Sequence, residues 1–228
     1  MGKMMGIKEL IENVEGYLDS FCSPEDKDKV NRILNAINTI DRKYFVDPEY
    51  AYLDTALPIG YNQTISQPST VARMLMLAEI NKGDDVLELG TGSGWNASLI
   101  AYISYPGKTL SLDIIDEIIQ KAKSNITGLK KELSEKDNRR LSNLELKFSN
   151  IFKNIDSWPE RYNKIVITAG IRPHQEDKIE KLALGLLEEE GRIICPHTQG
   201  PLMTLKKSKS TISKTYTAES YVFVPLFS

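Results

Sequence analysis

Cysteine and histidine are scarce in this chain of 228 residues. Cys22 and Cys195 lie far apart, and the two histidines are His174 and His197. These residues are too few and too widely spaced for a disulfide framework or a zinc site, so we expect no metal. Unpaired cysteines suit a reducing compartment, and we expect the protein to be cytoplasmic.

Long hydrophobic runs and an excess of one charge are also missing from the sequence. No segment has the length needed to cross a membrane, and the first ten residues carry Lys3, Lys8 and Glu9 where a secretory signal has an apolar core. The net charge of −2 provides no general attraction for nucleic acid. We therefore expect neither a membrane nor a nucleic acid as partner, and we expect a monomer.

The N-terminal part reads as helical and the segment after it as irregular. Hydrophobic periodicity predicts helices over 7–20 and 24–40, and Pro68 opens a further helix over 68–81. Pro48, Pro58 and Gly60 exclude long elements between 41 and 66. We therefore assign residues 1–66 to an N-terminal helical extension and substrate-side segment, and residues 67–228 to a ligand-binding domain.

Strands and helices alternate in the remainder, which predicts an α/β fold with a mostly parallel sheet covered on both faces. The predicted strands are 85–89, 109–113, 144–148, 163–168 and 191–195, and the predicted helices are 93–105, 115–132 and 174–187. The tail contains three further strands that can pair antiparallel, at 202–206, 213–217 and 221–226.

The most informative stretch runs from Val86 to Trp95, where an apolar strand leads through three alternating glycines into a helix. Glycines allow a sharp turn and a close approach of ligand to backbone. The spacing is G-x-G-x-G, and Trp95 stands where a dinucleotide-binding loop has its third glycine. With Glu88 before the first glycine, the loop resembles the S-adenosylmethionine loop of class I methyltransferases; the alternative is a nucleotide-binding turn of another kind. The resemblance implies cofactor contacts from Glu88, Gly90, Thr91, Gly92, Ser93 and Gly94.

A second acid follows at the end of the next strand. Asp113 lies about 20 residues beyond the glycines, where a carboxylate can bind two ribose hydroxyls. Its neighbour Ile114 is expected to contact the same ligand. The alternative is that Asp113 only caps the helix predicted over 115–132.

Residues 41–72 carry a more specific pattern. Its segments are Asp41-Arg42, Phe45-Val46, Ala51-Tyr-Leu-Asp54, Leu57-Pro-Ile-Gly60 and Gln63-Thr-Ile-Ser-Gln-Pro68. Together they resemble the protein-L-isoaspartate O-methyltransferase family, and Phe223-Val-Pro-Leu226 follows in the family's order. The resemblance implies a Rossmann-like class I methyltransferase fold, a seven-stranded sheet with its last strand antiparallel, S-adenosyl-L-methionine as cofactor, and a protein or peptide carboxylate as acceptor.

The resemblance also implies an acceptor site around Ser66. In the family this serine is an active-site residue, so we expect Ser66 and Thr64 to be catalytic and Ile65 to contact the substrate together with Ser66. A helix N-terminus attracts anions, so an acceptor carboxylate can dock beside the Ser66 hydroxyl. The alternative is a serine that only caps helix 68–81. Because a carboxylate is ionised at neutral pH, it can attack a sulfonium methyl group without a base.

The chain departs from the family pattern at several positions. Ser149-Asn150-Ile151 replaces the usual Gly-Asp-Gly, so Asn150 and Ile151 are expected at the adenine, with Asn150 accepting through its amide oxygen. Thr168 keeps the family's place beside the cofactor, whereas Arg172 is new and can pair with a carboxylate. Val224 is expected on the substrate side.

These departures favour a relative that modifies a C-terminal or other carboxylate of a biosynthetic peptide as the alternative to isoaspartyl methylation. A nucleic-acid methyltransferase and a non-catalytic cofactor-binding module are weaker alternatives. Against the first, this chain lacks the Asn/Asp-Pro-Pro-aromatic motif of enzymes that methylate the amino groups of bases. The corresponding residues here are Ile167-Thr-Ala-Gly170.

Overall fold

The protein was analysed as a computed structural model that describes residues 6–153, 155–209 and 211–226. The helices are α1 (Ile7–Asp19), α2 (Lys27–Thr39), α3 (Pro68–Ala78), α4 (Trp95–Ser104), α5 (Asp116–Lys130), α6 (Glu135–Arg140) and α7 (Glu176–Leu186). The strands are β1 (Leu57–Gly60), β2 (Gln63–Ile65), β3 (Val86–Leu89), β4 (Thr109–Asp113), β5 (Leu144–Phe148), β6 (Tyr162–Ile167), β7 (Leu187–Pro196), β8 (Gln199–Gly200), β9 (Leu202–Ser208), β10 (Thr211–Tyr216) and β11 (Tyr221–Val222).

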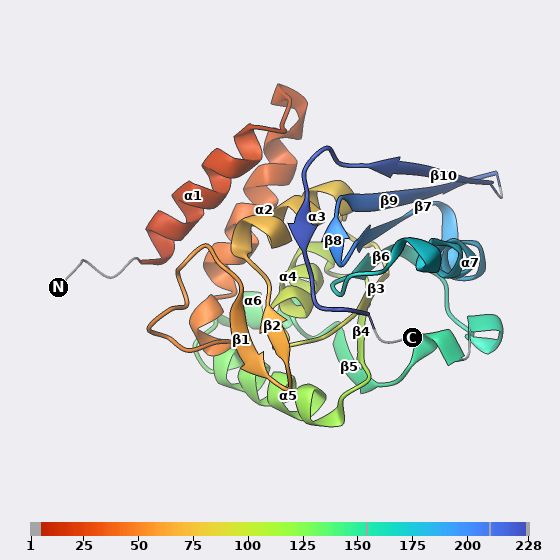
Figure 1. Cartoon of the computed structure of the whole chain (residues 1–228). Helices are drawn as coiled ribbons and strands as arrows, with labels where there is room; N and C mark the ends of the chain where they lie inside the picture. Colours follow the sequence, from red (N-terminus) through yellow and green to blue (C-terminus); the bar gives the residue numbers. More distant parts are fainter. Residues whose placement is uncertain (1–5, 154, 210, 227–228) are drawn as a thin grey trace.

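A seven-stranded sheet forms the centre of the molecule, in the order β10-β9-β7-β6-β3-β4-β5 (Figure 1). The five strands from β7 to β5 pair in parallel, as the alternation of strands and helices predicts. The expectation that the last strand is the reversed one is wrong, because β9 is antiparallel to β7 and β10 to β9. Strands β9 and β10 follow one another along the chain and pair as a hairpin, so β10 runs opposite to β9, just as β9 runs opposite to β7.

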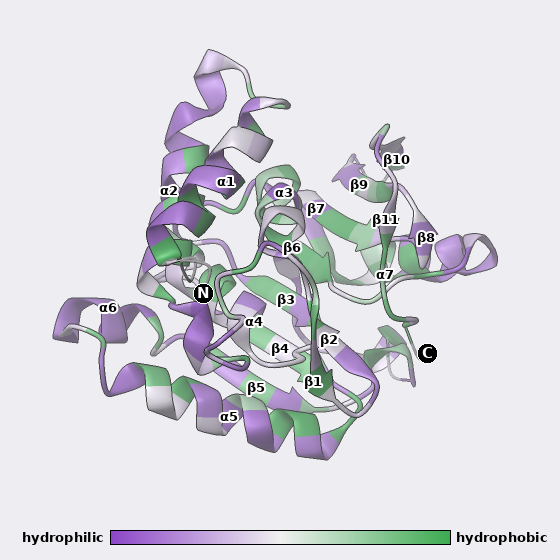
Figure 2. Ribbon diagram, turned by 60° about the vertical axis from the view of Figure 1, so that its left-hand side comes forward, coloured by the Kyte–Doolittle hydropathy of each residue, from purple (hydrophilic) through white to green (hydrophobic). Residues whose placement is uncertain are grey.

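The central strands β3 and β6 are buried on both faces and are largely hydrophobic (Figure 2). Val86, Val166 and Ile194 belong to a cluster that also contains apolar residues of α1 to α5. Leu87 and Ile165 belong to a second cluster with those of α7. The helices thus cover both faces, and the carboxyl ends of the parallel strands stay free for a ligand site.

The irregular segment contains a hairpin that the sequence does not predict. Strands β1 and β2 pair antiparallel, and the two central residues of their turn, Tyr61 and Asn62, both have left-handed φ angles, 54° and 56°. This is the backbone of a type I′ turn, which usually contains glycine. Lys121 on α5 holds the hairpin by donating to the Ile59 carbonyl at 2.8 Å.

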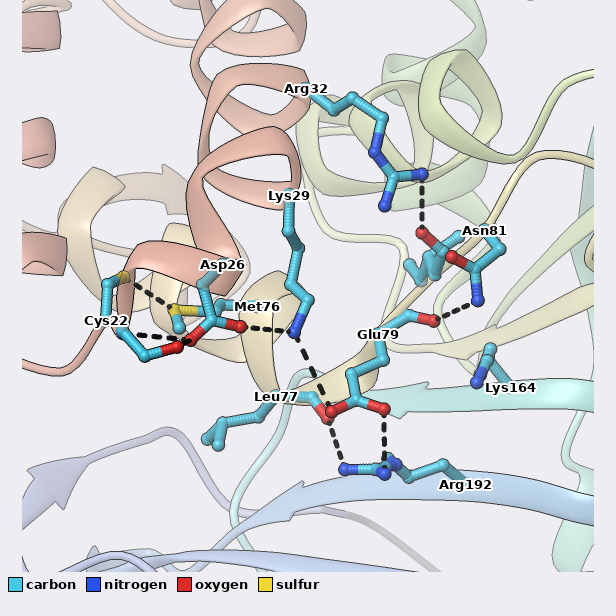
Figure 3. A network of polar contacts seen from close by, with 12 residues as sticks. Cys22, Asp26, Lys29, Arg32, Met76, Leu77, Glu79, Asn81, Lys164 and Arg192 are labelled. Atoms are coloured by element: carbon cyan, nitrogen blue, oxygen red, sulfur yellow. Dashed lines mark hydrogen bonds and ion pairs between the residues drawn. The ribbon is translucent and has the colours of Figure 1, made fainter.

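The N-terminal helices are joined to the rest of the protein by a core and by a polar network. Residues of α1 and α2 share one apolar cluster with Val86 and Trp95. At the end of α3, the Glu79 carboxylate forms ion pairs with Arg192 of β7 at 2.8 Å and with Lys29 of α2 at 3.7 Å (Figure 3). Arg192 also donates to the Leu77 carbonyl at 3.3 Å and so satisfies a terminal carbonyl of α3.

Within the described residues, none of the helices is both long and apolar enough to cross a bilayer.

We expect Arg192→Met to lower the free energy of unfolding by about 1–2 kcal/mol, because it removes the charged donor at the end of α3. Lys29→Met is the comparison: it removes the longer pair with Glu79 and a partly exposed pair with Asp26 at 2.9 Å, and pairs of this kind contribute about 1 kcal/mol or less each. Urea unfolding of both variants gives the two values. Equal losses would contradict a special role for Arg192.

Candidate active site

The glycine loop leaves the carboxyl end of β3 and runs into α4. Gly90 has φ +103°, and a Cβ there would overlap the Thr168 hydroxyl, which donates to the Gly90 carbonyl at 2.6 Å. Gly94 has φ +88°, with its Cβ position 3.1 Å from Ala122 on α5. Both positions therefore require glycine, and Thr168 acts on the loop itself, as a clamp on its backbone.

A cavity of about 500 Å³ lies on one side of this loop. The sequence-predicted residues Gly90, Asp113, Ile114, Asn150 and Ile151 all line it, together with residues that the sequence did not indicate, Gln63, Pro225 and Leu226 among them. The structure therefore brings together the β4 and β5 ends as expected. It adds the β1–β2 hairpin and the C-terminal segment as walls.

Asp113 is fixed by backbone donors. Its carboxylate accepts from Gly92 N and Ile115 N, each at 3.1 Å. Ile115 is itself the residue that precedes α5, so Asp113 does not bind the amides of the first helical turn. Burial raises the pKa of Asp113, and these backbone N–H groups oppose the rise. A carboxylate held in this way at a cavity wall can accept hydrogen bonds from a pair of hydroxyls.

Asn150 differs in detail from its expected role. Its Oδ1 accepts from Phe152 N at 3.0 Å, and within the described residues no hydrogen bond of its Nδ2 is found. The amide is then better placed to donate to a ring nitrogen than to accept from an amino group.

A second cavity, of about 430 Å³, lies on the other side of Gly90. It contains the loop residues Thr91, Gly92 and Ser93, and facing them the segment Thr64–Ser66. Thr168, Trp95 and Asn96 complete its wall. Gly90 belongs to the walls of both cavities.

Ser66 does not cap α3. The residue before this helix is Gln67, and its first free amide, Ser69 N, donates to the Asp54 carboxylate at 2.9 Å. Among the described residues, the Ser66 hydroxyl has no hydrogen-bond partner in the structure. Ser66 lines the second cavity, and because Gln67 is the residue that precedes α3, the capping alternative is removed.

The backbone around Ser66 is held by a buried arginine. Arg42 is 1% exposed and donates to the carbonyls of Ala51, Leu53, Thr55 and Ser66 at 2.9–3.2 Å. The guanidinium also lies over the Trp95 ring at 5.4 Å. Sequence reasoning quoted Asp41-Arg42 as a family signature without this role. The sequence feature that could have indicated this role is an arginine followed by an irregular segment, whose backbone carbonyls need hydrogen-bond donors.

Glu88 lies beneath the loop and lines neither cavity. Its side chain is fully buried, and its oxygens accept from Ser111 Oγ at 2.5 Å and Asn96 Nδ2 at 2.7 Å. Burial raises the pKa of Glu88 to about 8, although both hydrogen bonds oppose this. In this structure the Glu88 side chain therefore does not reach either cavity. From there it does not make the direct contact with a ligand amino group that the sequence led us to expect.

The raised pKa of Glu88 predicts a particular pH dependence of stability. The folded protein keeps a proton that the unfolded chain releases near pH 4.5, so the free energy of unfolding falls as pH rises from about 5 to 8. The slope is at most about 1.4 kcal/mol per pH unit. Glu88→Gln keeps the shape without titrating. The wild-type minus variant difference should therefore decrease with pH in urea unfolding, and a flat difference would contradict a protonated Glu88.

Two substrate-side residues are not brought to the cavities. Arg172 is exposed, with its backbone N–H bound to the Gln175 side chain. Val224 pairs through its carbonyl with Gly170 N at 2.7 Å, and it is the following residues, Pro225 and Leu226, that line the first cavity. The substrate contact predicted for Arg172 therefore has no support in this arrangement. The described ranges contain no group of three metal-ligating side chains.

The fold, with a ligand loop at the carboxyl end of its first parallel strand, is that of class I methyltransferases. It matches a Plasmodium falciparum protein-L-isoaspartate O-methyltransferase solved with S-adenosyl-L-homocysteine, with a TM-score of 0.75, 20% identity, and coverage of 98% of this chain and 99% of that one. A second solved protein-L-isoaspartate O-methyltransferase gives a TM-score of 0.74 at 22% identity, covering 98% of this chain and 66% of that one.

Sequence comparison identifies the family. The model of the protein-L-isoaspartate(D-aspartate) O-methyltransferase family matches residues 23–228. The enzyme of that name from Pyrococcus horikoshii is 32% identical over 98% of this chain and 96% of its own length, and that of Christiangramia forsetii is 34% identical over 86% and 85%. The chain belongs to the protein-L-isoaspartate O-methyltransferase family.

Proposed function

We propose that this protein is an S-adenosyl-L-methionine-dependent O-methyltransferase that methylates the free α-carboxylate of isoaspartyl residues in proteins and peptides. The observation that carries the proposal is that Ser66, whose hydroxyl has no hydrogen-bond partner among the described residues, lines the same cavity as the glycine-loop residues Gly90 to Ser93. Family membership supports it, because the relatives that match most of the chain are named for this reaction.

The residues fit the cofactor in two parts. Asp113 and Ile114 line the first cavity with Asn150, which suits a ribose and an adenine. Backbone amides of the loop, at the start of α4, suit the carboxylate of an amino-acid end in the second cavity. Gly90 lines both cavities, and Thr64 and Ser66 line the second, which supports an acceptor bound next to the cofactor.

The chemistry needs alignment more than acid or base groups. When bound, the cofactor supplies a methyl group activated by a positively charged sulfur. Ser66 can donate a hydrogen bond to one oxygen of the acceptor carboxylate and so direct the other oxygen at the methyl carbon. The new C–O bond forms as the C–S bond breaks, and the bonding pair stays on sulfur. No proton moves, because the acceptor is already ionised. Positioning of this kind can contribute several kcal/mol.

The peptide-tailoring alternative is not needed. It was favoured by Arg172, which the structure places on the surface outside both cavities. The relatives compared above span most of the chain and carry the isoaspartate name.

We further propose a division of labour along the chain. Residues 1–66 supply the acceptor side through Thr64, Ile65 and Ser66, and residues 67–228 supply most of the cofactor side. Gln63 lines the first cavity, so the N-terminal part also contributes one residue to the cofactor side. A monomeric, cytoplasmic enzyme remains our expectation from composition, and a solution mass well above 25.7 kDa would contradict the monomer.

Asp113→Ala tests the cofactor side. Loss of a charged acceptor for two hydroxyls should weaken S-adenosylhomocysteine binding by about tenfold to hundredfold in calorimetry, from roughly 1.5–3 kcal/mol of hydrogen bonding. Asp116→Ala, three residues further on and exposed, is the matched control and should bind normally. Unchanged affinity in Asp113→Ala would remove its assigned role.

Ser66→Ala tests the acceptor side and the reaction together. Wild-type protein should methylate an isoaspartyl peptide and leave the same peptide with normal aspartate unmodified, measured by transfer of labelled methyl. The variant should lose at least about tenfold in turnover, the cost of one hydrogen bond to a charged group. Because Ser66 caps no helix, its melting temperature and its affinity for S-adenosylhomocysteine should stay near wild type.

Equal turnover on both peptides by the wild type would overturn the isoaspartyl assignment. Full activity of Ser66→Ala would overturn the assigned role of the hydroxyl alone.

A further inference from the structure

Residues 221–226 form one wall of the first cavity. Backbone hydrogen bonds of 2.7–3.0 Å join this segment to Thr198, which follows β7, and to Gly170, which follows β6. At its far end, Pro225 and Leu226 line the cavity. The place of this wall therefore depends on how the whole segment is seated across the ends of the two strands.

The other end of the segment is tied to α1. Tyr221 begins the segment, is 9% exposed, and has its hydroxyl 2.9 Å from the hydroxyl of Tyr17. It is the only residue of the segment with a polar side chain, since the sequence is Tyr-Val-Phe-Val-Pro-Leu. In the described part of the chain, the contact with Tyr17 is thus the one side-chain hydrogen bond that fixes where the segment begins.

Tyr17 is itself held in place by its neighbours. Its ring packs edge-on against Phe21 with the centroids 5.1 Å apart, and the Arg73 guanidinium of α3 lies over Phe21 at 4.0 Å. The next residue along α1, Leu18, is fully buried in the apolar cluster that α1 shares with α3. A phenol with so little freedom loses little entropy when it forms a hydrogen bond, so Tyr17 suits the role of an anchor.

The hydroxyl pair is partly enclosed and has no substitute nearby. Burial raises the pKa of Tyr221, and its hydrogen bond with Tyr17 raises that pKa further. A neutral phenol can both donate and accept, so the two hydroxyls stay bonded at neutral pH. Glu219 lies two residues before Tyr221, but its buried Oε2 has no partner among the described residues and provides no second tie.

We propose that Tyr17 is a positioning residue for the cofactor, because its bond to Tyr221 seats residues 221–226 as a wall of the first cavity. A wall that is out of place loses apolar contact with the ligand, so the cofactor should bind more weakly without this bond. Tyr17 lies outside residues 23–228, which the family model matches, so family membership does not assign it this role. The inference rests on the proposed function only for the identity of the ligand.

A double-mutant cycle tests the bond. Affinity for S-adenosylhomocysteine is measured by calorimetry for wild type, Tyr17→Phe, Tyr221→Phe and the double variant. Each single variant should bind the ligand about threefold to tenfold more weakly, the range expected for the loss of one neutral hydrogen bond. The double variant should bind no more weakly than either single variant, because the two hydroxyls act only through each other.

Hydrogen exchange reports how the segment is seated without any ligand. The amides of Phe223 and Leu226 donate to Thr198 and Gly170, so they exchange when the segment lifts. In Tyr17→Phe their exchange should become about threefold to tenfold faster, relative to the amides of the buried strand β3.

Tyr102→Phe is the matched control. Tyr102 is 5% exposed, and its hydroxyl donates to Asp137 at 2.8 Å, between α4 and α6. Neither residue lines the first cavity. This variant should lose thermal stability to a similar extent as Tyr17→Phe and still bind S-adenosylhomocysteine as wild type does.

Wild-type affinity in folded Tyr17→Phe would overturn the proposal, and so would unchanged exchange of the segment or additive losses in the double variant. Equal weakening by Tyr102→Phe would also overturn it, because the loss would then follow from general destabilisation. If wild type did not bind S-adenosylhomocysteine, the failure would lie in the proposed function, and the exchange measurement would still decide whether Tyr17 seats the segment.

Discussion

The acceptor side of this protein depends on one buried cation. Arg42 is enclosed, and its Nη1 and Nη2 groups donate to four backbone carbonyls between Ala51 and Ser66, whereas its buried Nε has no partner among the described residues. Burial lowers its pKa to about 10, which leaves the guanidinium charged at neutral pH. A buried charge is costly without partners, and here backbone oxygens supply them. The irregular segment is thereby given one conformation, and Ser66 is fixed at its end without helix capping.

The cofactor side is held by a buried acid instead. Glu88 lies below the glycine loop and is bound to Ser111, which contacts Thr91 within the loop. From above, Thr168 donates to the Gly90 carbonyl. The loop is therefore restrained from both sides before any ligand arrives, and such restraint is what alignment-driven chemistry needs. Neither group that holds the loop has to touch the reacting atoms.

The sequence predicted those features that depend on neighbours along the chain. Strands 109–113 and 144–148 have the bounds expected, and Asp113 lies at a cavity because the end of a parallel strand puts it there. Features set by distant partners were missed or wrong. Glu88 reads as a ligand contact until β4 places Ser111 against it. Arg172 reads as a substrate contact because sequence does not show that its loop turns outward. Tyr61 and Asn62 form a hairpin turn without the glycine that would have indicated it.

Trp95 shows why the loop is not a dinucleotide loop in physical terms. A third glycine there would serve close packing of helix on strand. The indole instead donates to the Ile40 carbonyl at 2.8 Å and lies beneath the Arg42 guanidinium, while also lining the second cavity. The residue that follows the glycine loop is thus in contact with the cation that fixes Ser66. Trp95 therefore links the wall of the second cavity to the arginine that holds the Ser66 backbone, so packing at this one ring acts on both.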